Sequence, residues 1–536
     1  MDRFIAALVV CLVVVSSSTA SQYVVAPGGS DSNPGTAALP WQTLQHAADS
    51  VSAGDRVTVR PGEYSGFHLT ASGTSTLPIE FAAESGAVIT STNPVTIDGI
   101  NLEGASHVVI DGFEVVGMPR AGVRSVGPYS GGQQAFAEFV TIRNVTSRDN
   151  GKWGILTGFV NDLLIENNST SGSIDEHGIY VGNSGDRPTI RGNEIWGNNA
   201  NGIHINADQF SGLDGVIEEA LVSGNVIYDN GQGGGSGINL DGVKNSRIEN
   251  NLIYNSHASG ISLYQIDGAE PSTGNVVVGN TIHQAADGRW ALNLQNGAAN
   301  TTVANNIFLS DHNFRGAIDA SADSLSGLVS DYNVMISRFT TDDASSVMTL
   351  AEWQTNTGQD LHSQVATASE LFVAPDEGDY RLLATATARD MGWQEWTPDV
   401  DLRGAARPIG TGPDIGALEW IPTGDANADG QVNLADYTVV RNHLGATDLV
   451  PFTPVDVNND GTVDAADLAI WKERFGESAA GIEAGTSAVP EPRACGLVLG
   501  ALLGLGWLRS DLTKRLSSKL PEHFGQGVPC CEDFLI

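Results

Sequence analysis

Apolar and polar positions alternate in a recurring phrase between residues 139 and 318. Each copy has a short apolar segment, an Asn, a second apolar pair, a turn, and then Gly-Ile. The steps from one recurrent Asn to the next run from 24 to 32 residues, and the apolar pieces are too brief for helices. This is typical of a solenoid, in which each coil buries a face against its neighbours. The recurrent positions are Asn144, Asn168, Asn193, Asn225, Asn251, Asn280 and Asn306.

One coil can be divided into strands from residues 237–263. The alternation predicts strands at 237–240, 246–249 and 252–254, joined by turns and by a tight corner at 250–251. Three short strands per coil, each parallel to its counterpart in the next coil, predict an all-β parallel β-helix. Asn suits the corner because it tolerates left-handed backbone angles and its amide can bond to the coils above and below.

Both ends of the repeat carry segments of a different kind. Residues 1–20 combine Arg3, an apolar run and a small, polar exit, which predicts a secretory signal peptide cleaved after Ala20. A strand is expected at residues 23–27. Leu44, Ala47, Ala48 and Val51 mark one face of a helix that would cover the open end of the core. Further strands are expected around Val57, Ile79, Val95 and Val108, and a C-terminal cap over residues 337–420.

The Asn column, the opening "YVVAPGGSDSNPGT" and the closing "RPIGTGPDIGALEW" resemble the right-handed parallel β-helix proteins of the pectate-lyase-like superfamily. The resemblance covers residues 23–420, so the domain is expected to span 21–420. It implies the fold with its N-terminal capping helix. It does not imply one reaction, because that superfamily includes lyases, hydrolases, epimerases and non-catalytic adhesins.

Two twelve-residue segments have the oxygen pattern of a calcium loop. Ca²⁺ needs several oxygen ligands around a sharp bend, which Gly at position 6 permits, and position 7 offers its backbone carbonyl. The first loop has Asp425, Asn427, Asp429, Gly430, Gln431, Asn433 and Asp436. The second has Asp456, Asn458, Asp460, Gly461, Thr462, Asp464 and Asp467.

Each loop leads into a predicted helix, at residues 437–444 and 468–475. With Asp at position 12 and no helix before the loop, residues 424–476 resemble a type I dockerin. The resemblance implies two Ca²⁺ ions and a cohesin-bearing scaffold as partner. The alternative is a small Ca²⁺-clamped domain without a cohesin, because residues 434–435 and 465–466 lack the hydroxyl-bearing pair common in dockerins.

The C-terminal segment is expected to be a linker (477–493), a sorting or membrane segment (494–509) and a tail without an assigned role (510–536). Val-Pro-Glu-Pro at 489–492, an apolar run and Arg509 resemble the bacterial Pro-Glu-Pro sorting signal. The apolar run is a marginal membrane span. Together with the signal peptide, this predicts an exported or cell-envelope protein of a Gram-negative-type bacterium that is handled by envelope sorting machinery.

Composition narrows the partners. Lys and Arg number 27 against 63 Asp and Glu, a formal charge of -36, which argues against nucleic acid and anionic membranes and favours hard cations such as Ca²⁺. The four cysteines are Cys11, Cys495, Cys530 and Cys531, so the β-helix must be stabilised by packing and not by disulfides. It is expected to be monomeric.

Alternation along the Gly-Ile strand predicts which side chains face outward. With the Ile residues inward, two outward columns result, and because coils stack about 4.8 Å apart they form a continuous polar and aromatic strip suited to a polysaccharide. The first column is Leu156, Tyr180, His204, Asn239, Ser262 and Asn293. The second is Gly158, Gly182, Asn206, Asp241, Tyr264 and Gln295. The expected substrate-binding residues are Tyr180, Asn206, Asn239, Tyr264, Asn293 and, as a carboxylate anchor, Arg187.

A lyase on uronates needs a cation to neutralise the carboxylate, acidic ligands for that cation, and a base for the proton at C5. The candidate bases are His204 and Lys244, and Asp241 and Asp208 are candidate Ca²⁺ ligands in the groove. His177, in the acidic turn 175–177, is a candidate for acid/base work. The alternatives are a solvated lysine, a turn-capping Asp241 and a solvated turn.

These observations favour a Ca²⁺-assisted lyase acting on an acidic, uronate-containing polysaccharide. The alternatives are a non-catalytic carbohydrate-binding or adhesive surface protein, and a β-helix glycoside hydrolase or uronan epimerase. The polygalacturonase pattern is present only as the fragment 239–241, which makes a hydrolase a weaker hypothesis than a lyase. The sequence does not specify which polysaccharide is bound.

Overall fold

The computed structural model describes residues 20–342, 344–447, 449 and 452–479. The predicted signal peptide, sorting segment and tail, and most of the predicted linker, lie outside these residues. Within them, no helix is long and apolar enough to cross a membrane.

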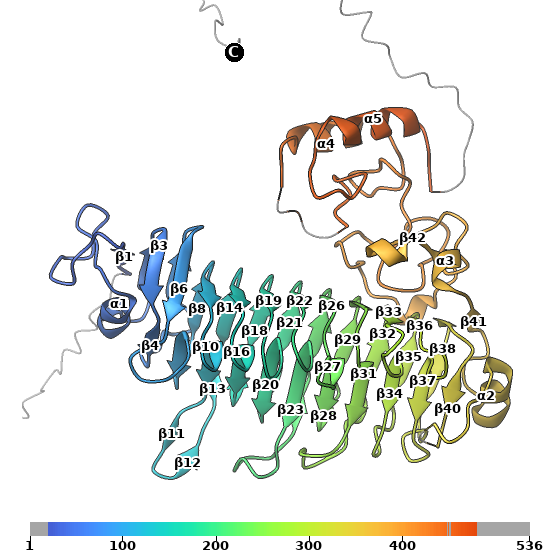
Figure 1. Ribbon diagram of the computed structural model, residues 1–536, viewed down its shortest axis with the longest axis horizontal. Coiled ribbons are helices and arrows are strands. Elements are labelled where there is room, and N and C mark those ends of the chain that lie inside the picture. Colours follow the sequence, from blue (N-terminus) through green and yellow to red (C-terminus); the bar gives the residue numbers. More distant parts are fainter. Residues whose placement is uncertain (1–19, 343, 448, 450–451, 480–536) are drawn as a thin grey trace, which may run out of the picture. The chain divides into compact units, whose positions relative to one another are not determined.

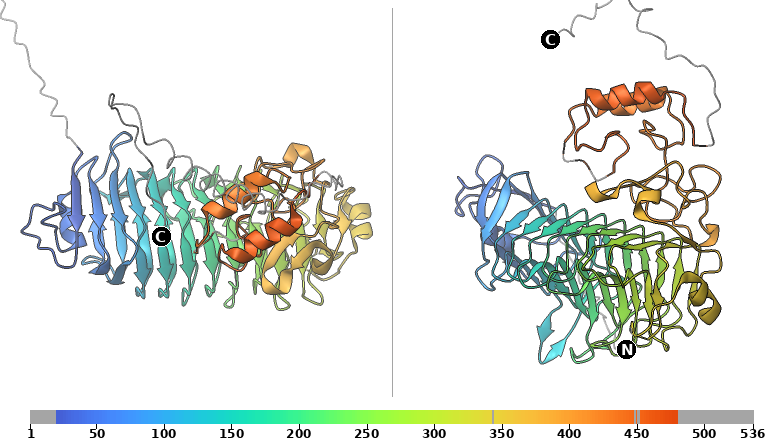
Figure 2. Two further views of the ribbon diagram at one scale, coloured as in Figure 1. Left: turned by 90° about the horizontal axis from the view of Figure 1, so that it is seen from above. Right: turned by 45° about the vertical axis from the view of Figure 1, so that its right-hand side comes forward.

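Three long parallel sheets of 12, 12 and 11 strands, here called sheets A, B and C, run through the repeat (Figures 1 and 2). Sheet A comprises β1 (Gln22–Val25), β2 (Arg56–Val59), β5 (Ile79–Ala83), β8 (Val108–Asp111), β14 (Val140–Arg143), β18 (Leu164–Glu166), β21 (Thr189–Arg191), β25 (Leu221–Ser223), β29 (Arg247–Glu249), β32 (Val276–Val278), β35 (Thr302–Ala304) and β38 (Val329–Asp331). Sheet B comprises β3 (Gly62–Ser65), β6 (Ala87–Ser91), β9 (Glu114–Val116), β15 (Thr146–Arg148), β19 (Ser169–Ser171), β22 (Glu194–Trp196), β26 (Val226–Tyr228), β30 (Leu252–Tyr254), β33 (Thr281–Gln284), β36 (Ile307–Ser310), β39 (Val334–Met335) and β41 (Gln364–Val365). Sheet C comprises β4 (Phe67–Leu69), β7 (Ile100–Glu103), β10 (Ala121–Val126), β16 (Trp153–Gly158), β20 (Ile179–Asn183), β23 (Ile203–Ala207), β27 (Ser236–Asp241), β31 (Ser259–Tyr264), β34 (Leu292–Leu294), β37 (Ile318–Ala320) and β40 (Phe339–Thr340).

Each coil contributes one strand to each sheet, as the sequence predicted for residues 237–263. There β27 belongs to sheet C, β29 to sheet A and β30 to sheet B, and β31 begins the next coil in sheet C. Four short strand pairs lie outside the three sheets: β11 (Tyr129–Ser130) with β12 (Gln133–Gln134), β13 (Ala137–Glu138) with β17 (Val160–Asn161), β24 (Ile217–Glu218) with β28 (Val243–Lys244), and β42 (Phe372–Ala374) with β43 (Asp379–Leu382).

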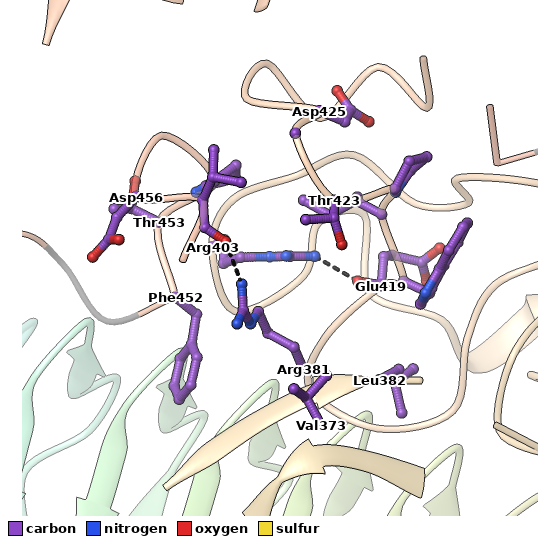
Figure 3. A pocket seen from close by; sticks show the side chains of 16 residues that line it. Val373, Arg381, Leu382, Arg403, Glu419, Thr423, Asp425, Phe452, Thr453 and Asp456 are labelled. Atoms are coloured by element: carbon purple, nitrogen blue, oxygen red, sulfur yellow. Dashed lines mark hydrogen bonds between the residues drawn. The ribbon is translucent and has the colours of Figure 1, made fainter. Parts of the chain in front are cut away.

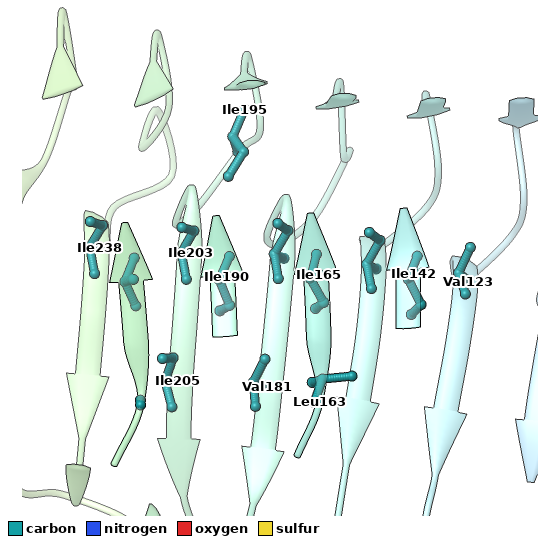
Figure 4. Packing of buried hydrophobic residues seen from close by; sticks show 14 of the residues in the cluster. Val123, Ile142, Leu163, Ile165, Val181, Ile190, Ile195, Ile203, Ile205 and Ile238 are labelled. Atoms are coloured by element: carbon teal, nitrogen blue, oxygen red, sulfur yellow. The ribbon is translucent and has the colours of Figure 1, made fainter. Parts of the chain in front are cut away.

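The core is a set of aliphatic columns inside the coils (Figure 4). Ile142, Ile165 and Ile190 follow one another in sheet A, and Ile203 and Ile238 do so in sheet C, all with 0% exposure. Burying each such side chain stabilises the fold by about 1.5–3 kcal/mol, so every added coil extends the same core.

A ladder of buried Asn side chains runs beside this core. Each Nδ2 donates to the Oδ1 of the next Asn and to a backbone carbonyl of the coil before, and each Oδ1 accepts a backbone N–H. The ladder consists of Asn168, Asn193, Asn225, Asn251, Asn280, Asn306 and Asn333. It satisfies polar groups that the tight corner would otherwise bury unpaired.

The predicted Asn column needs two corrections. Asn144 is outside the ladder, because its Nδ2 donates to Asp111 Oδ1 at 2.7 Å and Val145 occupies the ladder position. The left-handed backbone angles belong to the residue before each ladder Asn, such as Asn167 (φ 55°) and Asn250 (φ 53°). The ladder Asn is therefore selected for its side-chain amide and not for its backbone angles.

The N-terminal end is covered as expected. Helix α1 (Leu44–Ser50) begins at Thr43, whose side chain accepts the His46 N–H, and it buries Leu44, Ala47 and Ala48. The strand predicted around Val95 is wrong. Asn93 Oδ1 accepts the N–H groups of Val95 and Thr96 and bends the chain, which leaves Val95 62% exposed.

The C-terminal cap contains helices α2 (Leu350–Thr357) and α3 (Ala368–Leu371) and the 3-10 turns η1 (Pro375–Glu377) and η2 (Gln394–Trp396). The closing motif "RPIGTGPDIGALEW" forms one buried network. Arg407 donates to the Glu419 carboxylate at 2.9 Å and to the backbone oxygens of Asp414 and Gly416, and Glu419 accepts the Ile409 N–H. The motif therefore closes the cap by satisfying its own buried charges.

Helices α4 (Leu434–Asn442) and α5 (Ala465–Arg474) follow the two predicted calcium loops. Both begin three residues earlier than predicted. The reason is a capping box in each loop, in which Asn433 pairs with Asp436 and Asp464 pairs with Asp467. Residue 12 of the loop is thus inside the first turn of its helix.

Candidate functional site

The outward strip on sheet C has the register that the alternation predicts. Tyr180 pairs with His204, His204 with Asn239, and Asn239 with Ser262, while the second column joins Gly182, Asn206, Asp241 and Tyr264. Asn293 follows Ser262 in the first column. The predicted residues Tyr180, His204, Asn206, Asn239, Tyr264 and Asn293 therefore share one face of sheet C, on which Asn206 and Asn239 are each 7% exposed.

A groove of about 770 Å³ lies over the C-terminal half of this strip. Its floor includes Asn239, Ser262 and Asn293, and Tyr264 and Trp290 add aromatic surface. Ile266, from the turn 265–274, lines the groove, whereas the turn 207–219 contributes none of its lining residues. Such a polar and aromatic trough suits a hydroxylated chain ligand.

His177 and His204 lie side by side on neighbouring coils at the other end of the strip. The Nε2 atom of His177 is 3.1 Å from the Nδ1 atom of His204 and 3.5 Å from the Glu176 carboxylate. Tyr180 stacks on His177 at a centroid distance of 5.5 Å, and Lys152 binds Glu176 at 2.9 Å. This is the one place where two predicted catalytic candidates are in contact.

The hydrogen bonds assign the tautomers of the two histidines. The Nδ1 atom of His177 accepts the backbone N–H of Asn201 at 3.2 Å, so the hydrogen of a neutral His177 is on Nε2. Because this Nε2–H lies 3.1 Å from His204 Nδ1, a second hydrogen there would clash, which places the hydrogen of a neutral His204 on its own Nε2. His204 Nε2 is buried and has no partner among the described residues.

Both imidazoles are held neutral. Burial, partly offset by the Glu176 carboxylate, lowers the pKa of His177 to about 4. Burial also lowers the pKa of His204 well below its ordinary value, and His177 adds to the effect. A neutral His204 with its hydrogen on Nε2 is a hydrogen-bond donor, so the prediction that His204 is a base does not fit these hydrogen bonds.

Tyrosine and asparagine side chains are coupled across the coils of the strip. Asn206 Nδ2 donates to the Tyr180 hydroxyl at 3.2 Å, and Asn239 Nδ2 donates to the Tyr264 hydroxyl at 2.7 Å. Burial raises the pKa of both tyrosines, so both hydroxyls keep their hydrogen at neutral pH. Each hydroxyl can therefore still donate to a ligand.

Lys244 and Asp241 have structural roles in place of the predicted catalytic ones. Lys244 binds the Glu270 carboxylate at 2.5 Å and lies 3.9 Å from Glu218, and the hydrogen bond to Glu270 raises its pKa, so it remains charged. The Asp241 carboxylate accepts the backbone N–H groups of residues 266, 267 and 268. It caps the turn that follows β31 on the next coil, not the turn after its own strand β27, so the predicted turn-capping role is found one coil further on.

Two other candidates are also occupied elsewhere. Arg187 forms a bidentate ion pair with Asp162, in which Nε and Nη2 donate to the two carboxylate oxygens at 2.8 and 3.0 Å. It does not line the groove. Asp208 accepts the Phe210 N–H at 2.7 Å within its own turn. Among the described residues that line the groove, Asp319 is the one carboxylate, so the lining offers no carboxylate cluster for Ca²⁺.

Sequence reasoning missed the groove's arginines, Arg289 and Arg315, and its Trp290. Each precedes the inward residue of its strand by two or three positions, in a segment where the Gly-Ile phrase has become Trp-Ala-Leu and Gly-Ala-Ile. Aligning the coils on the inward Leu292 and Ile318, which pair with each other, would have found them.

The two calcium loops have the same hydrogen bonds at equivalent positions. Asp425 accepts the N–H groups of Asp429 at 3.1 Å and Gly430 at 2.8 Å, and Asp456 accepts those of Asp460 and Gly461 at the same distances. Asp436 and Asp467 each bridge the start of the loop and its helix cap.

This donor set fits Ca²⁺. In the first loop, three Asp carboxylates, two Asn oxygens and one backbone carbonyl surround the bend. In the second loop, Asp464 replaces one Asn, so the set is four Asp carboxylates, one Asn oxygen and one carbonyl. Hard oxygen ligands of this number suit Ca²⁺. Burial, with the nearby charges of Asp436 and Asp429, raises the pKa of Asp425 to about 7. A cation would relieve that repulsion. Residues 425, 427, 429, 431, 433 and 436, and their counterparts 456, 458, 460, 462, 464 and 467, would hold the ions.

A smaller pocket of about 130 Å³ in the C-terminal cap has charged walls that are already paired (Figure 3). Arg403 donates to the backbone oxygen of Glu419 at 2.5 Å and to the Asp401 carboxylate at 2.7 Å. Arg381 donates to the Asp379 carboxylate at 2.7 Å. These arginines stabilise the cap and do not form a site.

Comparison with known families agrees with this architecture. Residues 23–186 match the family model described as a Pel9A-like right handed beta helix region, residues 175–326 match that of a right handed beta helix region, and residues 423–476 match the dockerin type I domain. The predicted dockerin-like module, 424–476, coincides with the third match.

Individual relatives are distant. An uncharacterized protein, YwoF, of Bacillus subtilis (strain 168) is 27% identical over 261 residues, which cover 43% of this chain and 46% of the relative. The match thus spans about half the length of that relative. Similar structures are a pectate lyase, Pel9A (18% identity, TM-score 0.47, 75% of this chain and 97% of that one), and an alginate lyase from Paenibacillus sp. str. FPU-7 (21%, TM-score 0.40, 51% and 94%). From its own strand topology and the matched families, the chain is a right-handed parallel β-helix protein that carries a C-terminal type I dockerin module.

Proposed function

We propose that this protein is an exported enzyme that cleaves an acidic, uronate-containing polysaccharide by β-elimination. The observation that carries the proposal is the strip on sheet C, where sugar-compatible side chains follow one another coil by coil and open into a groove of about 770 Å³. A chain-like ligand lying along the coils would meet one polar or aromatic side chain about every 4.8 Å.

In a β-elimination, a base removes the proton at C5 of the uronate, the C4–O bond breaks, a C4–C5 double bond forms, and the leaving oxygen takes a proton. Negative charge builds on the uronate carboxylate as the proton leaves. A neutral donor held in place stabilises such charge without first losing a solvation shell. We assign this role to the Nε2–H of His204, which is buried and reaches the carboxylate only once the side chains over it move aside.

His177 is proposed as a positioning residue for His204. Its own orientation is set by the Asn201 N–H on one side and by His204 and Glu176 on the other, and Lys152 holds Glu176. Tyr180 and Tyr264 are proposed as sugar contacts, each with a hydroxyl oriented by an Asn. Asn206, Asn239 and Asn293 complete the proposed set of substrate contacts.

The proposal is tested by incubating the purified mature chain with pectate, alginate, chondroitin and neutral plant polysaccharides, with and without Ca²⁺. Ultraviolet absorbance of the new double bond, together with new reducing ends, is the expected result for one of the acidic polymers. Reducing ends without that absorbance would indicate a hydrolase, and a change of uronate configuration without cleavage would indicate an epimerase.

Non-catalytic binding is the second candidate function. It is favoured by the finding that Lys244 and Asp241, two of the four catalytic candidates, are occupied by structural contacts. Binding along the strip with no product from any of the polymers would establish it and would refute the lyase proposal.

For the dockerin module, we propose two Ca²⁺ ions and a cohesin-bearing scaffold as its partner. The support is the matching hydrogen-bond pattern of the two loops. Export by a signal peptide at 1–20 and handling of 494–509 by envelope sorting machinery, in a Gram-negative-type bacterium, complete the proposal. Retention of binding to a cohesin column in Ca²⁺ and its loss in chelator would support it.

A further inference from the structure

Two arginines in the sheet C groove lack the partners that other cations on the coils have. Arg120 binds Asp98 at 2.5 Å, Lys152 binds Glu176 at 2.9 Å, and Arg191 binds Glu166 at 2.7 Å. Across the part of the chain that the structure describes, neither Arg289 nor Arg315 has a carboxylate within ion-pair distance. Among the described residues, Arg60 and Arg338 also lack an ion pair, but they donate to backbone oxygens and do not line the groove, whereas Arg289 and Arg315 do.

The two arginines occupy equivalent positions on adjacent coils. Leu292 pairs with Ile318, and each arginine precedes its member of that pair by three residues. Successive coils are about 4.8 Å apart, so two like charges are held in neighbouring positions. Arg315 is also fixed to the same stretch, because its Nη1 donates to the Gly288 carbonyl at 3.4 Å.

The side chains in this column change from small residues to arginines along sheet C, and the arginines form part of the groove wall. At the equivalent position, three residues before the inward Ile, the three preceding coils have Ala200, Gly235 and Ala258. Gly235 lines the groove. Small residues open the wall over the middle coils, and the two arginines close it at the C-terminal end.

The charge balance of the groove is opposite to that of the whole chain. Its charged lining residues are Arg289, Arg315 and the buried Asp319. By contrast, the pocket beside Tyr254 and Tyr380 is lined by four carboxylates and by neither Lys nor Arg. Burial is the main cause of the lowered pKa of His312, and the positive charge of Arg315 is the second cause. This is the effect expected of a local positive field.

We propose that Arg289 and Arg315 form an anion-binding subsite that holds the acidic group of a glycan, either a carboxylate or a sulfate ester. Paired guanidinium groups match the planar, multiple acceptors of such groups. The subsite lies three coils (Arg289) to four coils (Arg315) from His204, about 14–19 Å along the strip. The inference rests on the proposed function for the glycan nature of the ligand and adds which residues select its acidity.

The test is binding of the mature full chain to polygalacturonate and to its methyl-esterified form, with dextran sulfate and dextran as the sulfate arm. The variants are Arg289→Gln, Arg315→Gln and the double variant. The matched control is Arg191→Gln, an exposed arginine on sheet A. Thermal unfolding of each variant shows that it is folded, and Arg289→Gln changes only an exposed side chain.

We expect the double variant to weaken binding of one acidic polymer by about tenfold or more, to reduce the salt dependence of that binding, and to leave the neutral polymers unaffected. Arg191→Gln should match the unmodified protein. Preference for polygalacturonate identifies a carboxylate subsite, and preference for dextran sulfate identifies a sulfate subsite. Unchanged acidic-polymer binding in the double variant overturns the inference even if cleavage persists. Loss of binding without any cleavage activity retains the inference and refutes the lyase.

Discussion

The Nε2 atom of His177 donates its hydrogen to the Nδ1 atom of His204 across 3.1 Å. Because His177 Nδ1 is already an acceptor for a backbone N–H, the pair has one consistent arrangement of hydrogens, and it leaves His204 with a donor and not with a free lone pair at Nε2. The contact joins two coils that are 27 residues apart in sequence. It converts an imidazole that sequence alone suggests as a base into a neutral hydrogen-bond donor.

Substitution of His204 distinguishes these two roles. His204→Ala should lower kcat/KM on the active polymer by about 10²–10³, the usual effect of removing one donor that stabilises transition-state charge. His204→Gln keeps an N–H and should retain clearly more activity than His204→Ala. Equal loss in both variants would show that His204 transfers a proton. Lys244→Ala, in β28 and paired with Glu270, should remain within a few-fold of the unmodified enzyme.

Stability should depend on pH through His177. Its pKa is lowered to about 4 in the folded protein, against about 6.5 when unfolded, so the unfolded chain binds the extra proton first as the pH falls. The stabilisation is therefore complete above pH 6.5 and is lost progressively as the pH falls toward 4, with a slope of at most about 1.4 kcal/mol per pH unit for this group.

Guanidinium unfolding at several pH values between 7 and 4 measures that slope. His177→Gln removes the titrating ring and should give a flatter dependence than the unmodified protein. Identical slopes in His177→Gln and the unmodified protein would mean that His177 is not the group responsible.

Local patterns predicted the fold and the outward strip because the same alternation of apolar and polar residues recurs in every coil. The alternation that buries Ile203 also turns His204 outward, so the register follows from the sequence. What could not be predicted depends on contacts between coils and on the turns. The sequence makes Lys244 a plausible base, but in the structure the Glu270 carboxylate from another turn binds it. Arg289 belongs to no sequence motif, and only the strand pairing of Leu292 with Ile318 aligns it with Arg315.

Removal of Ca²⁺ should unfold the dockerin module before the β-helix. The free energy of ion binding is folding free energy for a module of this size, since the core around Val440 and Val463 is small. Limited proteolysis of the full chain in chelator should therefore cut within 423–476 and leave the β-helix intact. Asp436→Ala and Asp467→Ala should show the same cuts in the presence of Ca²⁺. Equal protease resistance with and without chelator would contradict the loop assignment.

The Asn ladder should contribute strongly to the stability of the β-helix, and Asn144 provides its control. Asn251→Ala removes the acceptor of the Asn225 N–H and the donor to the Val222 carbonyl, both fully buried, so we expect a loss of at least about 2 kcal/mol in the free energy of unfolding. Asn144→Ala removes one exposed contact and should cost less than about 1 kcal/mol. Guanidinium unfolding followed by far-ultraviolet circular dichroism compares the two, and a similar small loss in both would show that the ladder is satisfied by water once it is broken.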